Sequence, residues 1–271
     1  MKSFKMKALA VAVLGLAGMG SVMAATCPSI AAGNVTGGGA GGGAWFGQSQ
    51  GGGGTLSIVN PGLHGTTCAL NVAISAAPVA NLKGQVIDNS PQSESRYRAR
   101  FYFDSSALAL PLANVQATIF DAFANTAPGT QGTDEVQIFL AGGAAPALHF
   151  VVADSGKSTG VQNISYTLPT SANGHYYVEF DLTKGAGSSS TVACNGGDAG
   201  CFRYWVVAEG GTAPTDPSPS GTYSASNAGW SGIVQAQLGL YGTTANFRAD
   251  NASKNFAVDE FDSRRQTFIG F

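Results

Sequence analysis

Two carboxylates spaced two residues apart, Glu179 and Asp181, come closest to a catalytic pair in this 271-residue chain. In an extended strand, side chains two residues apart point to the same face of the sheet. Glycoside hydrolysis uses two carboxyl groups about 5 to 9 Å apart, one of which protonates the leaving oxygen. A solvated outer strand face explains the same spacing, so the pair is a candidate and not a signature.

Histidines and nucleophilic serines are poorly represented. The only histidines are His64, His149 and His175, and no Gly-x-Ser-x-Gly turn holds a serine nucleophile. We interpret His149 and His175 as strand-face residues. The sequence therefore predicts neither a Ser–His–Asp hydrolase nor a cofactor-dependent site.

Acidic residues in predicted loops raise the question of a calcium site. Asp154, Asp250 and Asn251 could supply oxygen ligands to one Ca²⁺ at a loop end. Solvated loop acids are the competing interpretation, and we favour it.

Short runs of alternating apolar and polar residues must position any such site. In the run 96–103, Tyr97, Ala99, Phe101 and Phe103 share one parity, opposite the arginines. The alternation recurs in the runs 135–140, 147–153, 175–182 and 233–240, and clusters of turn-forming residues separate them. This pattern predicts an all-β protein, an antiparallel sandwich of two sheets.

The polar parity of these strands supplies candidate ligand-binding residues. If they line a groove on the concave sheet, they can bind a glycan through planar hydrogen bonds and aromatic stacking. The candidates are Arg98, Arg100, Gln137, Tyr177, Glu179, Gln235 and Gln237, with Trp205 as a stacking platform. The alternative is that these are solvated sheet positions and that Trp205 belongs to the core.

The last run, 256–265, breaks its own alternation. Phe256 and Val258 share a parity that Phe261 does not, which predicts a β-bulge at Asp259-Glu260. Together with the runs 97–103, 176–181 and 238–240, the stretch Val258-Asp259-Glu260-Phe261 resembles the strands of concanavalin-A-like (laminin-G-like) jelly rolls. The resemblance covers residues 96–269 and implies a jelly-roll sandwich. That superfamily includes lectins, adhesion modules, glucanases and polysaccharide lyases, so it implies a fold more than a function.

The glucanases of this superfamily carry Glu-x-Asp-x-x-Glu on one strand. The resemblance maps the first two acids onto Glu179 and Asp181, but Lys184 stands where the second Glu is required. This departure argues against hydrolase turnover.

The lyases similar to alginate lyases use an Arg, a Gln-Ile-His strand and a Tyr near the C-terminus. The resemblance maps the Arg onto Arg98 or Arg100, and Gln137-Ile138 begins the second motif. Phe139 stands where the His is required, and the Tyr-x-Lys-x-Gly motif is absent. These departures argue against lyase turnover.

The N-terminus and the cysteines indicate an exported protein. Residues 1–24 combine three lysines, an apolar run and small residues at the end, as a signal peptide does. Of the three possible pairings of four cysteines in an exported chain, we favour Cys27–Cys68 and Cys194–Cys201. We predict a secreted protein, periplasmic or extracellular, without a transmembrane anchor.

Composition sets the remaining limits. Charged residues make up 11% of the chain, glycines number 38, and the net charge of −2 argues against nucleic acid or an anionic membrane as partner. We divide the chain into the signal peptide, a Gly-rich segment over 25–60 and one sandwich over 61–271. The favoured function is non-enzymatic binding of a polysaccharide, surface glycan or other cell-surface partner. The alternatives are an exported structural or matrix protein and a polysaccharide-degrading enzyme.

Overall fold

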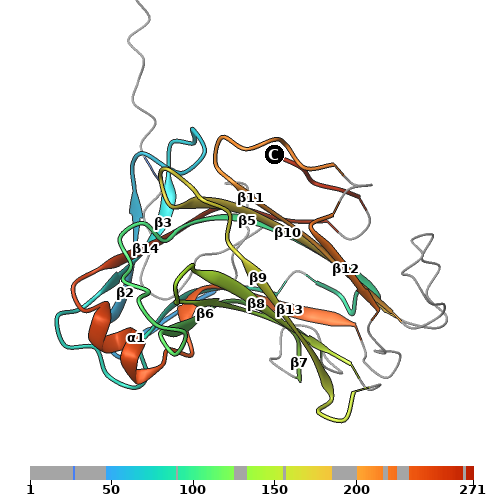
Figure 1. The fold of residues 1–271 in the computed structure, drawn as a ribbon, viewed down its shortest axis with the longest axis horizontal. Helices are drawn as coiled ribbons and strands as arrows, with labels where there is room; N and C mark the ends of the chain where they lie inside the picture. Colours follow the sequence, from blue (N-terminus) through green and yellow to red (C-terminus); the bar gives the residue numbers. More distant parts are fainter. Residues whose placement is uncertain are drawn as a thin grey trace, which may run out of the picture.

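The protein is an antiparallel β-sandwich of jelly-roll type. The computed structural model describes residues 27, 47–89, 91–124, 133–154, 157–184, 200–215, 219–224, 232–264 and 267–271. Two layers of strands face each other across a core (Figure 1), which confirms the predicted fold class.

Among the described residues, each layer contains six strands. In hydrogen-bonded order, one layer is β12 (Gly221–Ser224), β11 (Cys201–Ala208), β10 (His175–Thr183), β5 (Arg96–Asp104), β14 (Asn255–Arg264) and β3 (Ala69–Ile74). The other is β4 (Lys83–Asp88), β13 (Ile233–Tyr241), β6 (Gln116–Ala124), β7 (Thr133–Ala141), β8 (Ala147–Ala153) and β9 (Val161–Thr167). Strands β2 (Gly54–Val59) and β1 (Gly47–Gly51) carry the hydrogen-bonded ladder from β3 to β4, so the two layers are one continuous sheet folded over.

Aromatic side chains from both layers fill the space between them. Phe101 on β5 stacks on Phe120 on β6 with ring centroids 5.6 Å apart, and Phe150 on β8 stacks on Tyr204 on β11 at 4.5 Å. All four belong to one buried cluster. Large aromatic residues therefore supply much of the area that this core removes from water.

The predicted bulge in the last strand is present. The register between β14 and β5 shifts between Asp259 and Asp262, and Glu260 has a φ of 46°. The bulge turns Phe261 to the core side, where its ring stacks on Phe120 at 6.4 Å. Phe261 is only half-buried, because it packs at the margin of the core.

The sandwich begins earlier in the chain than residue 61. Strands β1 and β2 lie inside the segment 25–60 that the sequence analysis separated from the domain, and they pair with β4 and β3. A Cβ on Gly54 would lie 2.3 Å from the carbonyl oxygen of Lys83, so glycine is what allows this close approach of backbones. Glycine richness here permits pairing and does not mark a linker.

The one helix of the described residues, α1 (Ala245–Asp250), is too short to show a helical period in the sequence. Thr244 caps it by accepting a hydrogen bond from the Phe247 N–H at 3.2 Å. Asn251 follows the helix, and its side-chain oxygen accepts from the Ala109 N–H at 2.7 Å. The amide of Asn251 thus anchors a loop. In the described part of the chain no three His, Cys, Asp or Glu side chains gather as a metal site would require.

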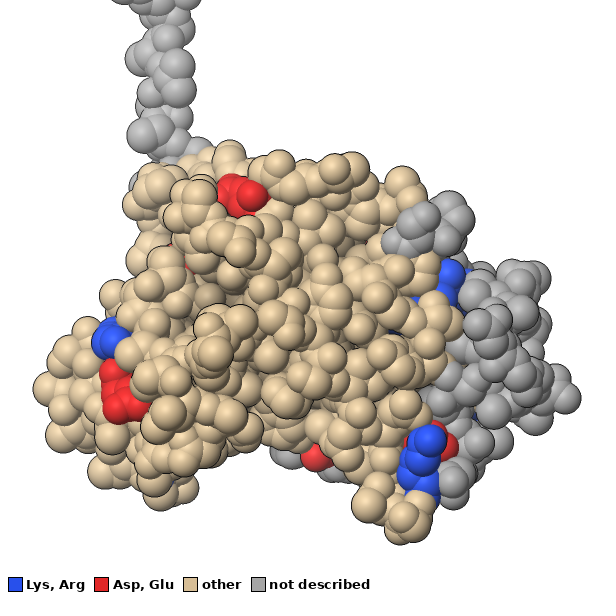
Figure 2. All heavy atoms as spheres, in the orientation of Figure 1, with Lys and Arg blue, Asp and Glu red and all other residues tan. Residues whose placement is uncertain are grey.

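The predicted disulfide between Cys27 and Cys68 is present. Cys201 is also disulfide-bonded, but Cys194 lies outside the described residues, so the Cys194–Cys201 pair stays a prediction. The predicted signal peptide, 1–24, also lies outside them. Within the described ranges, no helix has the length and apolar character needed to cross a bilayer. Charged side chains are few and scattered on the face in Figure 2, with no patch of one sign.

Candidate functional site

The eight predicted ligand-binding residues do not form one groove. Five of them lie on β5, β10 and β11 in one layer: Arg98, Arg100, Tyr177, Glu179 and Trp205. The other three, Gln137, Gln235 and Gln237, lie on β7 and β13 in the opposite layer. The alternation of polar and apolar residues along a strand shows which side chains point away from the core. It does not show to which of the two layers the strand belongs. For this reason the prediction of a single groove is wrong.

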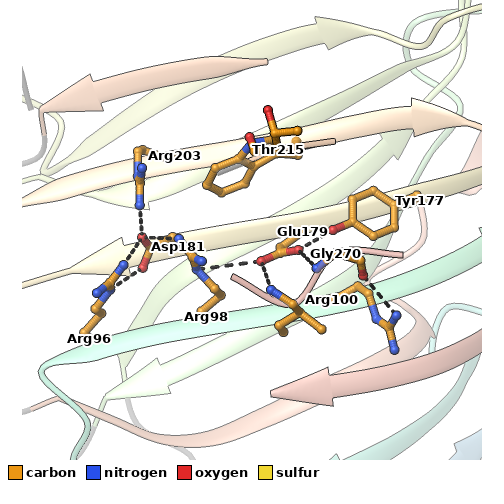
Figure 3. A network of polar contacts seen from close by, with 11 residues as sticks. Arg96, Arg98, Arg100, Tyr177, Glu179, Asp181, Arg203, Thr215 and Gly270 are labelled. Atoms are coloured by element: carbon orange, nitrogen blue, oxygen red, sulfur yellow. Dashed lines mark hydrogen bonds and ion pairs between the residues drawn. The ribbon is translucent and has the colours of Figure 1, made fainter. Parts of the chain in front are cut away.

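On the first layer, the arginines serve a buried ion network. Figure 3 shows Arg96, Arg98 and Arg203 converging on Asp181, with nitrogen–oxygen distances of 2.9, 2.9 and 2.6 Å. Burial alone would raise the pKa of Asp181, but the hydrogen bond from Arg96, the charge of Arg98 and the hydrogen bond from Arg203 outweigh it and lower that pKa. Asp181 is therefore a structural anion, not half of a catalytic pair.

Glu179 holds a second segment of the chain in place. Its two carboxylate oxygens accept the backbone N–H groups of Ile269 and Gly270 at 2.9 and 3.0 Å, and the Tyr177 hydroxyl donates to it as well (Figure 3). Arg100 donates to the carbonyl of Gly270 at 3.1 Å. Both Glu179 oxygens are thus committed to the protein itself.

Two aromatic residues of the C-terminal segment also pack on this layer. Phe268 packs on Trp205 with centroids 5.3 Å apart, and Phe271 packs edge-on against Tyr177 at 5.0 Å. Trp205 is only 1% exposed and lies in a small buried cluster with Tyr102 and Tyr177. The alternative interpretation of Trp205 as a core residue is therefore confirmed.

The opposite layer presents a different surface, which we call the amide face: Gln85, Asn89, Asp121, Gln137, Gln235, Gln237 and Tyr241. Its side chains form a chain of hydrogen bonds, in which Gln85 donates to Gln237, Gln237 to Gln235 at 2.8 Å, and Gln235 to Asn89 at 2.9 Å. The side chains of Gln85, Gln235 and Gln237 are buried, whereas Tyr241 on β13 and Gln137 on β7 are half-exposed. Gln137, Gln235 and Gln237 therefore lie on one face, and their role in ligand binding stays a prediction.

The strand register places Asp121 at the centre of the amide face. It pairs with Gln237 on β13 and with Gln137 on β7. The Gln137 side chain donates to Asp121 Oδ2 at 2.9 Å. Burial first, and then the nearby charge of Asp134, raise the pKa of Asp121 to about 8. Such a carboxyl exchanges a proton close to neutral pH, as general acids and bases do.

Tyr241 lies beside Asp121. Burial and the adjacent carboxyl raise the pKa of the Tyr241 phenol well above its ordinary value, so the phenol stays protonated. Among the described residues, neither Asp121 Oδ1 nor the Tyr241 hydroxyl has a hydrogen bond of good geometry. Buried polar atoms without partners are rare and call for an explanation, such as a ligand.

Next to Asp121 and its neighbours, a second set of paired residues runs across the strands of the same face. In register, Tyr241 pairs with Thr118, Thr118 with Phe139, and Phe139 with His149. Burial lowers the pKa of His149, so its imidazole is neutral near pH 7. Three strand spacings, about 14 Å, separate the backbone of His149 from that of Tyr241.

Sequence reasoning missed Asp121 and Tyr241. Asp121 lies in a mostly apolar, buried strand, which is an unusual place for a carboxylate. Tyr241 shares its parity with Gln235 and Gln237, so the same alternation could have included it. What the arrangement can do chemically is hydrogen-bond a hydroxylated ligand and move a proton.

Comparisons with known proteins agree with the fold. No protein-family model and no curated protein match the chain. Among solved structures, it is similar to the endo-β-1,4-glucuronan lyase from the fungus Trichoderma reesei, with a TM-score of 0.55 and 16% identity over 86% of this chain and 93% of that one. It is also similar to a double mutant of alginate lyase Aly36B in complex with an alginate trisaccharide, with a TM-score of 0.51 and 12% identity over 79% and 88% of the two chains. At these identities the likeness establishes a shared fold.

Proposed function

We propose that this protein is an exported polysaccharide lyase that cleaves a uronic-acid-containing polysaccharide on its amide face. The single observation that carries the proposal is that Asp121 Oδ1 and the Tyr241 hydroxyl are buried side by side among side-chain amides, without a hydrogen bond of good geometry. The similar solved structures are named as lyases of glucuronan and alginate. Their likeness favours the polysaccharide-degrading alternative over non-enzymatic binding.

The chemistry of eliminative cleavage fits these groups. The reaction removes the C5 proton next to the uronate carboxyl, breaks the bond between C4 and O4, and forms a C4=C5 double bond. O4 must take up a proton as it leaves. Tyr241, whose raised pKa keeps the phenol protonated, is suited to donate that proton. Gln137, which is half-exposed, is placed to orient the sugar.

Export is supported by the Cys27–Cys68 disulfide, because disulfides persist in oxidising compartments. The predicted signal peptide agrees with it. A polysaccharide too large to enter a cell is a substrate for an exported protein.

Phe139 favours a second candidate function, binding of the same polysaccharide without cleavage. The resemblance implies His at this position, and an apolar ring exchanges no proton. Purified protein mixed with alginate or polyglucuronate separates the two candidates. A lyase releases products that absorb in the ultraviolet through the new C4=C5 bond, whereas a binder retains polymer and releases none.

Replacing Tyr241 by Phe is expected to lower kcat by about 10²–10⁴-fold, with KM little changed, because the proton donor is lost while its ring stays in place. Initial rates of ultraviolet product formation measure this. Tyr166→Phe is the control, since Tyr166 packs against the core side of the same layer. Equal rates for Tyr241→Phe and the native protein would exclude Tyr241 as the donor.

A further inference from the structure

Elimination on the amide face requires a base that accepts the C5 proton. The position at which the resemblance implies a histidine does not supply one. Phe139 follows Gln137-Ile138 where the resemblance implies His. His149 pairs with Phe139 on the neighbouring strand, but three strand spacings, about 14 Å, separate its backbone from that of Tyr241. Another group on the face must accept the C5 proton.

We propose that Asp121 is the general base of the reaction and that it returns its proton to Tyr241 after each turnover. This inference rests on the proposed lyase function and assigns the catalytic step that the function leaves open. It replaces a histidine by a buried carboxylate on β6.

The geometry of Asp121 suits this role. Its Oδ2 is held by the Gln137 amide at 2.9 Å, which fixes the carboxylate plane. Its Oδ1 has no hydrogen bond of good geometry among the described residues, and the Tyr241 hydroxyl lies beside the carboxyl. One oxygen is thus anchored, and the other lies buried without a hydrogen bond of good geometry. In this proposal the substrate approaches it from the half-exposed side at β7 and β8.

The proton and electron balance closes within two side chains. Asp121 Oδ1 takes the C5 proton, and the electron pair of the C5–H bond forms the C4=C5 bond. The C4–O4 bond breaks, and O4 takes the phenolic proton of Tyr241. Asp121 then gives its proton to the Tyr241 phenolate, which lies beside it. No oxidant, reductant or metal is needed.

The electrostatic surroundings set the pH at which Asp121 can act. Asp134 acts on Asp121 from β7 and Tyr241 from β13, while Glu135 on β7, His149 on β8 and Lys83 on β4 lie in the same layer. The groups that act on the Asp121 pKa are Asp134, Gln137, Tyr241 and the Ala122 N–H, and none of them is a cation. Below pH 8 the carboxyl is mainly protonated and is no base. Activity should therefore rise with pH through about 8.

The test compares Asp121→Asn with Glu135→Gln on alginate and polyglucuronate across the pH range. Glu135 is a matched control, because burial also raises its pKa, to about 7, and it lies on the adjacent strand. We expect Asp121→Asn to lose about 10²–10⁴-fold in kcat while still binding polymer. Glu135→Gln should keep both its turnover and the rise near pH 8.

Each outcome decides between the claims. Native protein that gives no unsaturated product on any uronate polymer defeats the lyase function, and this inference with it. If Asp121→Asn keeps the native turnover, the role of Asp121 as base is overturned, while the lyase function stands. The same conclusion follows if His149→Gln loses turnover and Asp121→Asn keeps it. Should Asp121→Asn fail to fold, a native kcat that is flat from about pH 6 to about pH 9 overturns it as well.

Discussion

Replacing Asp181 by Ala is expected to destabilise the fold by about 3 to 5 kcal/mol, because it leaves buried arginines without their counter-charge. Arg98 is fully buried, and Arg203 is 7% exposed. Their guanidinium groups contact Asp181 Oδ2 at 2.9 and 2.6 Å. Loss of one carboxylate therefore strands several positive charges away from water.

Urea unfolding followed by fluorescence measures this loss of stability. Asp104→Ala is the matched control, since Asp104 pairs with His175 at 3.5 Å near the surface and such exposed pairs contribute about 1 kcal/mol or less. A loss of under about 1 kcal/mol in Asp181→Ala would mean that other groups neutralise the arginines.

Acid should weaken the same network. The folded-state pKa of Asp181 lies below its ordinary value of 3.8. Its stabilising contribution is therefore complete above that value and is lost as the pH falls through the lower, folded-state pKa. In Asp181→Asn this part of the acid dependence should be missing, which thermal melts at acidic pH can show.

Asp121→Asn is expected to be more stable than the native protein at alkaline pH. The pKa of Asp121 is raised from 3.8 to about 8, so the folded state holds this proton more tightly than the unfolded chain does. Stability linked to the group is complete below the ordinary value and is lost as the pH rises toward 8. Since each tenfold change in proton affinity is worth about 1.4 kcal/mol, the gain has an upper bound of about 6 kcal/mol.

Thermal melts of both proteins across the pH range measure the difference. The advantage of Asp121→Asn should be absent near pH 4, grow up to about pH 8 and then level off. A variant that is less stable than the native protein at pH 8 would contradict the raised pKa. Higher stability combined with lost turnover would be the trade-off expected of a buried functional carboxyl.

The sequence alone was sufficient for features whose cause is local. The alternation over 96–103 predicted that Tyr97, Ala99, Phe101 and Phe103 share a face, and all four lie in the core. The slipped parity before Phe261 predicted a bulge that the register of β14 confirms. Period-two patterns carry this information because neighbouring side chains alternate across any strand.

The predicted start of the sandwich was wrong because the pairing of the Gly-rich segment is not a local property. A Gly-rich stretch cannot bury enough apolar area to fold alone, so residues 47–59 were assigned outside the sandwich. In the fold, β1 and β2 gain their stability from backbone pairing with β4 and β3. That pairing depends on strands contributed by other parts of the chain.

The site was decided by tertiary structure alone. Alternation placed Glu179 and Gln137 on outward faces, but the order of strands in the folded-over sheet put them on opposite layers. Packing of Phe268 and Phe271 then closed the face around Glu179. Asp121 and Tyr241 are distant in the chain, and only the pairing of β6 with β13 brings them together. Strand order and register are long-range properties, because they depend on which segments meet in the folded sheet and not on the residues within each strand.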